Sequence, residues 1–297
     1  SYMGAARDAF YADYPEIFYV DFSLLTLRVT RTADKYCAYL GPGRKDNYFV
    51  SGFTGKEDVE AALAEYNARV DEILKGAEKL TPDDGADIEE KKIQYAHDEI
   101  IRHTSYRLEN TCTKGNAGHI RTAYGALVKG ESLCEGYARA VKGVLDKMAI
   151  PCVLVQGGYQ SSEGRTEPHM WNYVQVGDEW YGLDATMDDP ISPLPGENGM
   201  DGFERSDYLI VGNDVMGKRH LPDGVMSEAD FEFAYPEIAG RSLLFDEVFN
   251  SNGLKVEYNE GATEGDLQTG IYKVSWNGMG AAKRIESGKD RLMKETK

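Results

Sequence analysis

Three residue types that perform acyl transfer follow one another along this chain: Cys134, His169 and Asp184. A cysteine thiolate attacks a carbonyl carbon, an imidazole moves the proton, and a carboxylate orients the imidazole. The chemistry open to such a set is attack on an amide through a thioester. Whether the three residues meet depends on the elements that carry them.

We expect Cys134 in the first turn of a helix over residues 132–148. Ser132 and Glu135 have the spacing of a capping box, with Ser as N-cap and Glu reaching back to its amide. The unpaired N–H groups and the positive end of the helix dipole favour a thiolate there. Apolar residues continue the buried face at helical spacing: Ala138, Val141 and Leu145. From the helix alone, an inert core cysteine is an equal alternative.

His169 and Asp184 lie on two predicted strands, 169–176 and 179–185, which flank a Gly-Asp pair typical of a two-residue hairpin turn. This turn places Trp171 opposite Asp184, so that His169 is diagonal to Asp184 on the same face. A three-residue turn would send Asp184 to the opposite face. An aspartate beside a histidine fixes the imidazole tautomer and stabilises the imidazolium.

The other histidines are weaker candidates. His97 and His103 are six residues apart on a predicted helix and face different ways, which excludes a simple two-histidine metal site. His119 and His220 lie in loop-like segments with no evident partner. The acidic pair at 188–189 is more typical of a solvated loop than of a cation site.

The remaining cysteines indicate neither a metal site nor a cofactor. No pair forms CxxC, and no histidine stands at zinc-ligand spacing from a cysteine. Cys152 opens an apolar strand and is expected in the core. Nothing in the sequence indicates a catalytic role for Cys37 or Cys112. Unpaired thiols fit the spacing at least as well as disulfides.

The pattern along the chain predicts an α+β protein, with a helix packed on a mostly antiparallel sheet. Extended segments are expected at 13–30, 36–40, 48–53, 153–157 and 208–211, helices at 56–80 and 88–103, a linker at 81–87, a loop at 187–205 and a hairpin from 254–258 and 270–276. The predicted domains are an N-terminal α/β extension (1–84), a catalytic domain (85–240) and a C-terminal β-rich appendage (241–297).

Composition excludes some function classes. The 297 residues carry a formal charge of −17, which repels phosphate backbones and argues against nucleic-acid binding. No apolar run is long enough to span a bilayer, and no signal peptide is visible.

Three segments resemble the core motifs of the transglutaminase-like superfamily: GESLCEGYA at 130–138, PHMWN at 168–172 and WYGLDAT at 180–186. The resemblance covers about residues 88–190 and is closest to the bacterial cysteine peptidases and acyltransferases. It implies a papain-like core with Cys134 as nucleophile, His169 as base and acid, and Asp184 as orienting group. Ala185 stands where many members have proline.

The resemblance also implies a function. It indicates protein or peptide substrates, a thioester resolved by water or by an amine, with hydrolysis slightly favoured, and a bacterial extracellular or cell-envelope location. The backbone N–H of Cys134 is one oxyanion donor, and Tyr124 is a second candidate by position only. A catalytically silent binding module of the cell envelope is the alternative, which the intact triad disfavours. A metal-dependent hydrolase lacks a ligand cluster.

Overall fold

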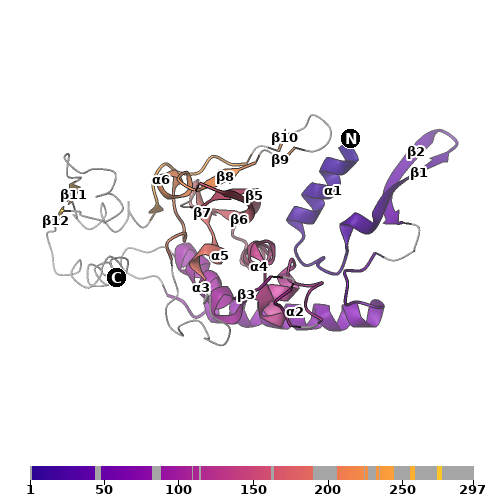
Figure 1. Ribbon diagram of the computed structural model, residues 1–297, viewed down its shortest axis with the longest axis horizontal. Helices are drawn as coiled ribbons and strands as arrows, with labels where there is room; N and C mark the ends of the chain where they lie inside the picture. The colour runs from indigo at the N-terminus through magenta and orange to yellow at the C-terminus, as the bar shows by residue number, and fades with distance from the viewer. Residues whose placement is uncertain are drawn as a thin grey trace.

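The computed structural model describes residues 2–43, 48–81, 88–108, 110–113, 115–161, 164–189, 206–223, 225–226, 232–233, 235–243, 255–257 and 273–275. Helices and antiparallel strands are mixed, which confirms the α+β class (Figure 1). Among these residues, no helix is both long and apolar enough to cross a membrane.

A four-stranded antiparallel sheet forms the centre of the fold, in the order β7-β6-β5-β8. Its strands are β5 (Cys152–Gln160), β6 (Thr166–Val176), β7 (Glu179–Leu183) and β8 (His220–Pro222). Val176 pairs with Glu179 and Asn172 pairs with Leu183. The two-residue turn and its register are therefore confirmed.

The predicted second strand of the hairpin is two residues too long. β7 ends at Leu183, and Asp184 is the N-cap of the short helix α5 (Ala185–Asp188). Trp171 and Asp184 are therefore one step beyond the ladder instead of a paired position. The chain leaves the sheet here because an aspartate side chain that caps a helix satisfies backbone N–H groups that the strand would otherwise pair.

Three helices pack against one another, and the one that begins at Cys134 lies directly on one face of the sheet (Figure 1). They are α2 (Lys56–Ala77), α3 (Ile88–His103) and α4 (Cys134–Lys147). Side chains of α4 share a core with Val174, Val176 and Leu183. Because side chains alternate along a strand, His169 and Trp171 lie on the other face.

The smaller elements complete the description. They are α1 (Tyr2–Asp13), η1 (Phe22–Leu24), β1 (Leu25–Thr32), β2 (Lys35–Pro42), β3 (Ser105–Tyr106), the π-helix η2 (Gly125–Lys129), β4 (Glu131–Ser132), α6 (Asn213–Met216), β9 (Val225–Met226), β10 (Glu232–Phe233), β11 (Lys255–Glu257) and β12 (Lys273–Ser275). β11 and β12 pair antiparallel, as the predicted C-terminal hairpin requires.

The helices over 56–80 and 88–103 are confirmed, whereas the N-terminal segment differs from the prediction. Of the extended segment 13–30, only 25–30 belongs to a strand, and the segments 48–53 and 208–211 form single bridges. The predicted linker lies outside the described residues except for Thr81, and so does the predicted loop from residue 190 onward. The division into three domains stays a prediction, although Tyr66 of α2 and Tyr137 of α4 share one core.

The predicted capping box is wrong. Helix α4 begins at Cys134 with Leu133 as its N-cap. The buried Ser132 hydroxyl lies 3.0 Å from the Ile120 carbonyl oxygen and 2.9 Å from that of Leu133. The Glu135 carboxylate accepts a hydrogen bond from the Tyr11 hydroxyl instead. The hydroxyl of Ser132 is directed to backbone carbonyls because this residue belongs to β4, one step before the helix.

The start of α4 is packed so closely that position 136 requires glycine. A Cβ on Gly136 would lie 2.1 Å from Ser132 Oγ and 2.8 Å from the Thr122 carbonyl oxygen. We expect Gly136→Ala to lower the free energy of unfolding by about 1–3 kcal/mol in urea titrations, because the helix start must shift. Gly240→Ala is the control, since its Cβ would meet no atom within 4 Å. Equal stability of the two variants would contradict the packing argument.

Candidate active site

The carboxylate of Asp184 is held at the start of α5. Its Oδ1 accepts hydrogen bonds from the backbone N–H groups of Thr186 (3.0 Å) and Met187 (3.1 Å). Aspartate is a favoured N-cap because it satisfies N–H groups that have no intrahelical acceptor. Only 1% of the Asp184 surface is exposed. These bonds fix the carboxylate and leave Oδ2 free for other partners.

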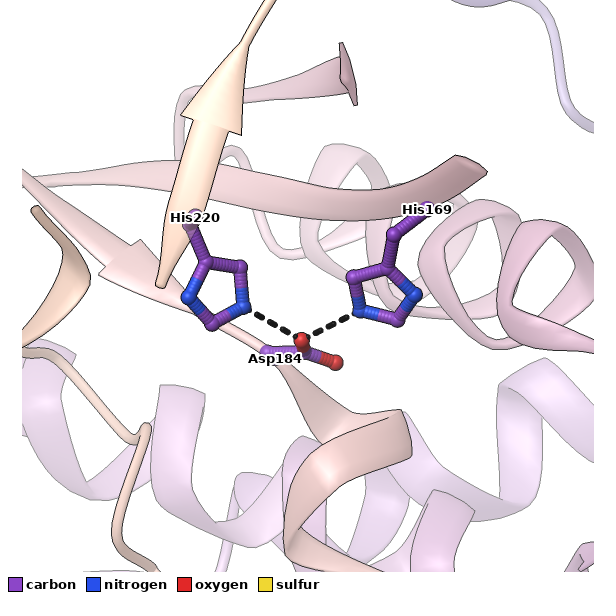
Figure 2. A group of neighbouring side chains, drawn as sticks. All are labelled: His169, Asp184 and His220. Carbon is purple, nitrogen blue, oxygen red and sulfur yellow. Dashed lines mark hydrogen bonds and ion pairs between the residues drawn. The ribbon is translucent and has the colours of Figure 1, made fainter. Parts of the chain in front are cut away.

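His169 on β6 meets this carboxylate. Its Nε2 lies 2.6 Å from Asp184 Oδ2, and the other ring nitrogen faces away from Asp184 (Figure 2). This separation falls inside the range of roughly 2.6–3.2 Å expected for an orienting hydrogen bond. Burial by itself lowers the pKa of His169. The charge and hydrogen bond of Asp184, followed by those of Cys134, outweigh burial and raise the pKa to about 10.

Cys134 is the first residue of α4 and is half-buried. Its hydrogen bonding and its charge act on the imidazole of His169 and help to raise the pKa of that ring. Burial, followed by the charge of Cys134, raises the pKa of the Tyr106 phenol. The structure thus brings together the three residues that the sequence singled out.

A second imidazole, missed in the sequence, completes the group. His220 on β8 places its Nε2 2.8 Å from Asp184 Oδ2 (Figure 2). The expectation that His220 lacks a partner is therefore wrong. The cause is long-range pairing: Tyr159 of β5 lies opposite His220 in the sheet. No local pattern around His220 announces this contact, which spans 36 residues.

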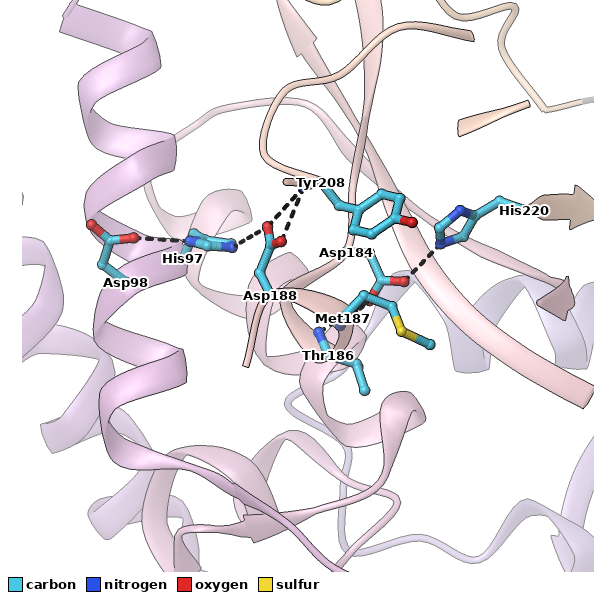
Figure 3. A network of polar contacts seen from close by, with 8 residues as sticks. All are labelled: His97, Asp98, Asp184, Thr186, Met187, Asp188, Tyr208 and His220. Carbon is cyan, nitrogen blue, oxygen red and sulfur yellow. Dashed lines mark hydrogen bonds and ion pairs between the residues drawn. The ribbon is translucent and has the colours of Figure 1, made fainter. Parts of the chain in front are cut away.

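His97 and Asp188 form a second buried pair beside the first (Figure 3). His97 Nε2 lies 3.1 Å from Asp188 Oδ2, and its Nδ1 lies 2.9 Å from Asp98 Oδ1. The Asp188 carboxylate also accepts the backbone N–H of Tyr208. The interpretation of residue 188 as part of a solvated loop is therefore wrong, since Asp188 is fully buried.

The imidazole of His97 is protonated in this buried pair, although burial alone would favour its neutral form. Desolvation lowers the pKa of His97, but hydrogen bonds and charges of Asp188 and Asp98 outweigh it and raise the pKa to about 9. Burial also raises the pKa of Asp188. Because the carboxylates of Asp188 and Asp98 both contact this imidazole, we assign the proton to His97. The sequence offers one indication that Asp188 lies near Asp184: the two residues are four apart, which is the spacing of one helix face.

Three side chains are close enough to hold a metal ion: His169, Asp184 and His220 have ligand atoms within 4.8 Å of one another. Zinc binds each ligand at about 2.0–2.1 Å, which would hold the nitrogen and oxygen atoms roughly 3 Å or more apart. The separations of 2.6 and 2.8 Å are shorter and are those of hydrogen bonds. The arrangement therefore fits shared protons better than a metal.

Tyr124, the candidate oxyanion donor, is a core residue with a partner of its own. Its ring stacks on Phe18, and its hydroxyl donates to Glu65 Oε2 at 2.5 Å. To serve an oxyanion, this hydroxyl would have to leave Glu65. The role of Tyr124 stays a prediction.

The other cysteines differ from Cys134. None of the four forms a disulfide. Cys152 is buried, as expected, and burial raises its pKa to about 12, so its thiol stays protonated. Cys37 is exposed and Cys112 is partly buried.

Comparisons with known proteins found similar solved structures but no match by sequence. No family model matches the chain, and no curated protein matches it. A transglutaminase structure is 14% identical with a TM-score of 0.34, and the alignment covers 61% of this chain and 49% of the other. A candidate cysteine protease from Cytophaga hutchinsonii is 12% identical with a TM-score of 0.30, covering 56% and 63%.

A candidate protease from Parabacteroides distasonis is 16% identical with a TM-score of 0.27, and the alignment covers 55% of this chain and 36% of the other. The matched region thus spans about half the length of the transglutaminase. Alignments with such TM-scores carry no argument about activity. What the site can do follows from its own residues.

The buried histidine pair gives a pH-dependent prediction. His97→Leu leaves Asp188 without its cation, so we expect the free energy of unfolding to fall by about 3–5 kcal/mol near neutral pH. Folding places the carboxylates of Asp188 and Asp98 beside His97 and raises its pKa above the value in the unfolded chain. Its contribution is therefore complete below a pH of about 6.5 and is lost as the pH rises through about 9. Urea titrations at several pH values measure the difference.

The control is His103→Leu, because His103 lies on the same helix but is exposed. We expect it to cost about 1 kcal/mol or less. A loss in His97→Leu that does not shrink between pH 7 and pH 10 would contradict the protonated pair.

Proposed function

We propose that this protein is a cysteine-dependent enzyme that transfers or hydrolyses acyl groups of protein or peptide amides. One observation supports the proposal above the others: His169 Nε2 lies 2.6 Å from Asp184 Oδ2, and Cys134 at the start of α4 acts on the same imidazole. A nucleophile, a proton carrier and an orienting carboxylate in this order are the parts that thioester chemistry needs.

In the proposed reaction the imidazolium of His169 balances a Cys134 thiolate. The thiolate sulfur attacks the carbonyl carbon of the amide and forms a C–S bond. The C–N bond then breaks, and His169 gives its proton to the departing amine. Neutral His169 next removes a proton from water or from an acceptor amine, which attacks the thioester and releases Cys134. A pKa raised to about 10 keeps His169 protonated at neutral pH, so the proton for the departing amine is in place before the C–N bond breaks.

The developing oxyanion needs hydrogen-bond donors. The N–H of Cys134 is among the first in α4, and such groups have no acceptor within their helix. The hydroxyl proton of Tyr124 is held by Glu65, whereas Tyr106, whose pKa is raised by burial and by the charge of Cys134, keeps its phenol proton and is a second candidate donor.

The finer assignments rest on the motif resemblance. They are a papain-like core within residues 85–240, flanking extensions at 1–84 and 241–297, membership of the transglutaminase-like superfamily, and an extracellular or cell-envelope location in a bacterium. Hydrolysis is favoured slightly over transfer to an amine. A silent binding module is the competing function, and an unreactive Cys134 would favour it.

The first test concerns the thiol. Because Cys134 combines a helix N-terminus with an imidazolium, we expect iodoacetamide at about pH 6 to label it before the other three cysteines. Cys152 should be slowest, because its thiol is buried and protonated. Brief labelling followed by mass mapping gives the order. Equal labelling of all four cysteines, or earlier labelling of Cys37, would remove the support for a reactive thiolate.

The second test separates the members of the triad. On a peptide amide that the wild type turns over, Cys134→Ala should abolish turnover and His169→Ala should nearly do so. Asp184→Asn should lower kcat by about 10⁴-fold, the scale seen when an orienting aspartate is lost. Product analysis with and without a primary amine distinguishes hydrolysis from transfer. Full activity of folded Asp184→Asn would show that the orienting role is wrong.

A further inference from the structure

We propose that His220 is a positioning residue of this site: it donates a hydrogen bond to Asp184 and shares the carboxylate charge that otherwise acts on His169 alone. The inference rests on the proposed function for its consequence in catalysis. The hydrogen bond from His220 to Asp184 and the protonation state of His220 are inferred from the geometry alone.

The two imidazoles approach the same oxygen atom. His169 Nε2 lies 2.6 Å and His220 Nε2 lies 2.8 Å from Asp184 Oδ2. An ionised carboxylate only accepts hydrogen bonds, so each Nε2 must carry a proton. His220 is 2% exposed, and among the described residues its Nδ1 has no hydrogen-bond partner. A buried ring with one unpartnered nitrogen favours the neutral Nε2–H tautomer, because a second proton on Nδ1 would be a buried, unpaired donor.

Aromatic rings fix the orientation of His220. The ring centroids of Trp171, Tyr208 and Tyr159 lie 4.9, 5.0 and 5.2 Å from that of His220. Trp171 also stacks on the ring of His169 at 5.9 Å, so one indole borders both imidazoles. Such contacts leave His220 no freedom to turn its Nε2 away from Asp184. Its position is as well determined as that of His169.

The consequence concerns the charge on Asp184. The titratable groups around His220 are Asp184, His169, Tyr159 and Tyr208, and burial raises the pKa of the Tyr208 phenol well above neutral pH. Asp184 is the one group among them that carries a negative charge at neutral pH. A hydrogen bond from His220 to this carboxylate therefore weakens its pull on the proton of His169. His169 then releases its proton to the departing amine more readily than beside an unshared carboxylate.

The variants follow from this geometry. His220→Leu removes the donor, and His220→Gln places an amide N–H near the same position. Leu221→Ala is the control, because Leu221 is the next residue of β8 and is exposed. Circular dichroism checks that each variant is folded, and EDTA in every buffer excludes a metal bound by the two imidazoles and Asp184.

The decisive measurement is an NMR titration of the His169 imidazole in ¹⁵N-labelled protein. We expect its pKa to rise in His220→Leu by about one unit, the size of a single hydrogen-bond effect. His220→Gln should lie near the wild type, and Leu221→Ala should equal it. On an amide substrate, kcat of His220→Leu should fall about tenfold, with rescue by glutamine. A His169 pKa that is unchanged or lowered in folded His220→Leu overturns the proposal.

A second measurement needs no variant. Nitrogen chemical shifts of wild-type His220 near pH 7 should show a neutral ring protonated at Nε2. A doubly protonated ring, or a proton on Nδ1, overturns the proposal even if His220→Leu fails to fold. Failure of the proposed function is distinguishable, because it would appear as an unreactive Cys134 in wild-type protein, whatever the state of His220.

Discussion

The site depends on one buried carboxylate whose hydrogen-bonding capacity is filled. Asp184 is almost fully removed from water, and desolvation of this kind raises the pKa of a carboxyl group. The charge of His169 and the hydrogen bonds of His169 and His220 act in the opposite direction and lower the pKa below its usual range. Two backbone N–H groups of α5 occupy the other oxygen. The ion is stable in the interior because each oxygen has two donors.

This constraint determines how several elements meet. The carboxylate belongs to the residue between β7 and α5, and its partners come from β6, β8 and the first turn of α5. The far end of α5 is held by the ion pair of Asp188 with His97 on α3. A four-residue helix has little stability of its own, so these polar contacts at its two ends must fix its position. Breaking either end would release the carboxylate of Asp184 from the position that it holds beside His169.

The sequence predicted the parts of this arrangement that depend on short-range geometry. Gly177 and Asp178 determine a two-residue turn, and the turn determines which residues of the two strands share a face. Helix α2 followed from apolar periodicity. The capping box failed because its pattern is equally compatible with Ser132 in a strand, bonded to the carbonyl of Ile120, 12 residues earlier in the chain.

The two histidines that the sequence left without partners show where local reasoning ends. His97 contacts a carboxylate 91 residues away, and His220 contacts one 36 residues away, so neither contact leaves a periodic pattern. Burying a charged carboxylate requires donors, however, and that requirement is predictable once the hairpin places Asp184 inside. The fold supplied donors that were distant in the chain. The proposed nucleophile, base and orienting residue can thus be singled out from motifs, whereas the environment that sets their protonation belongs to the tertiary structure.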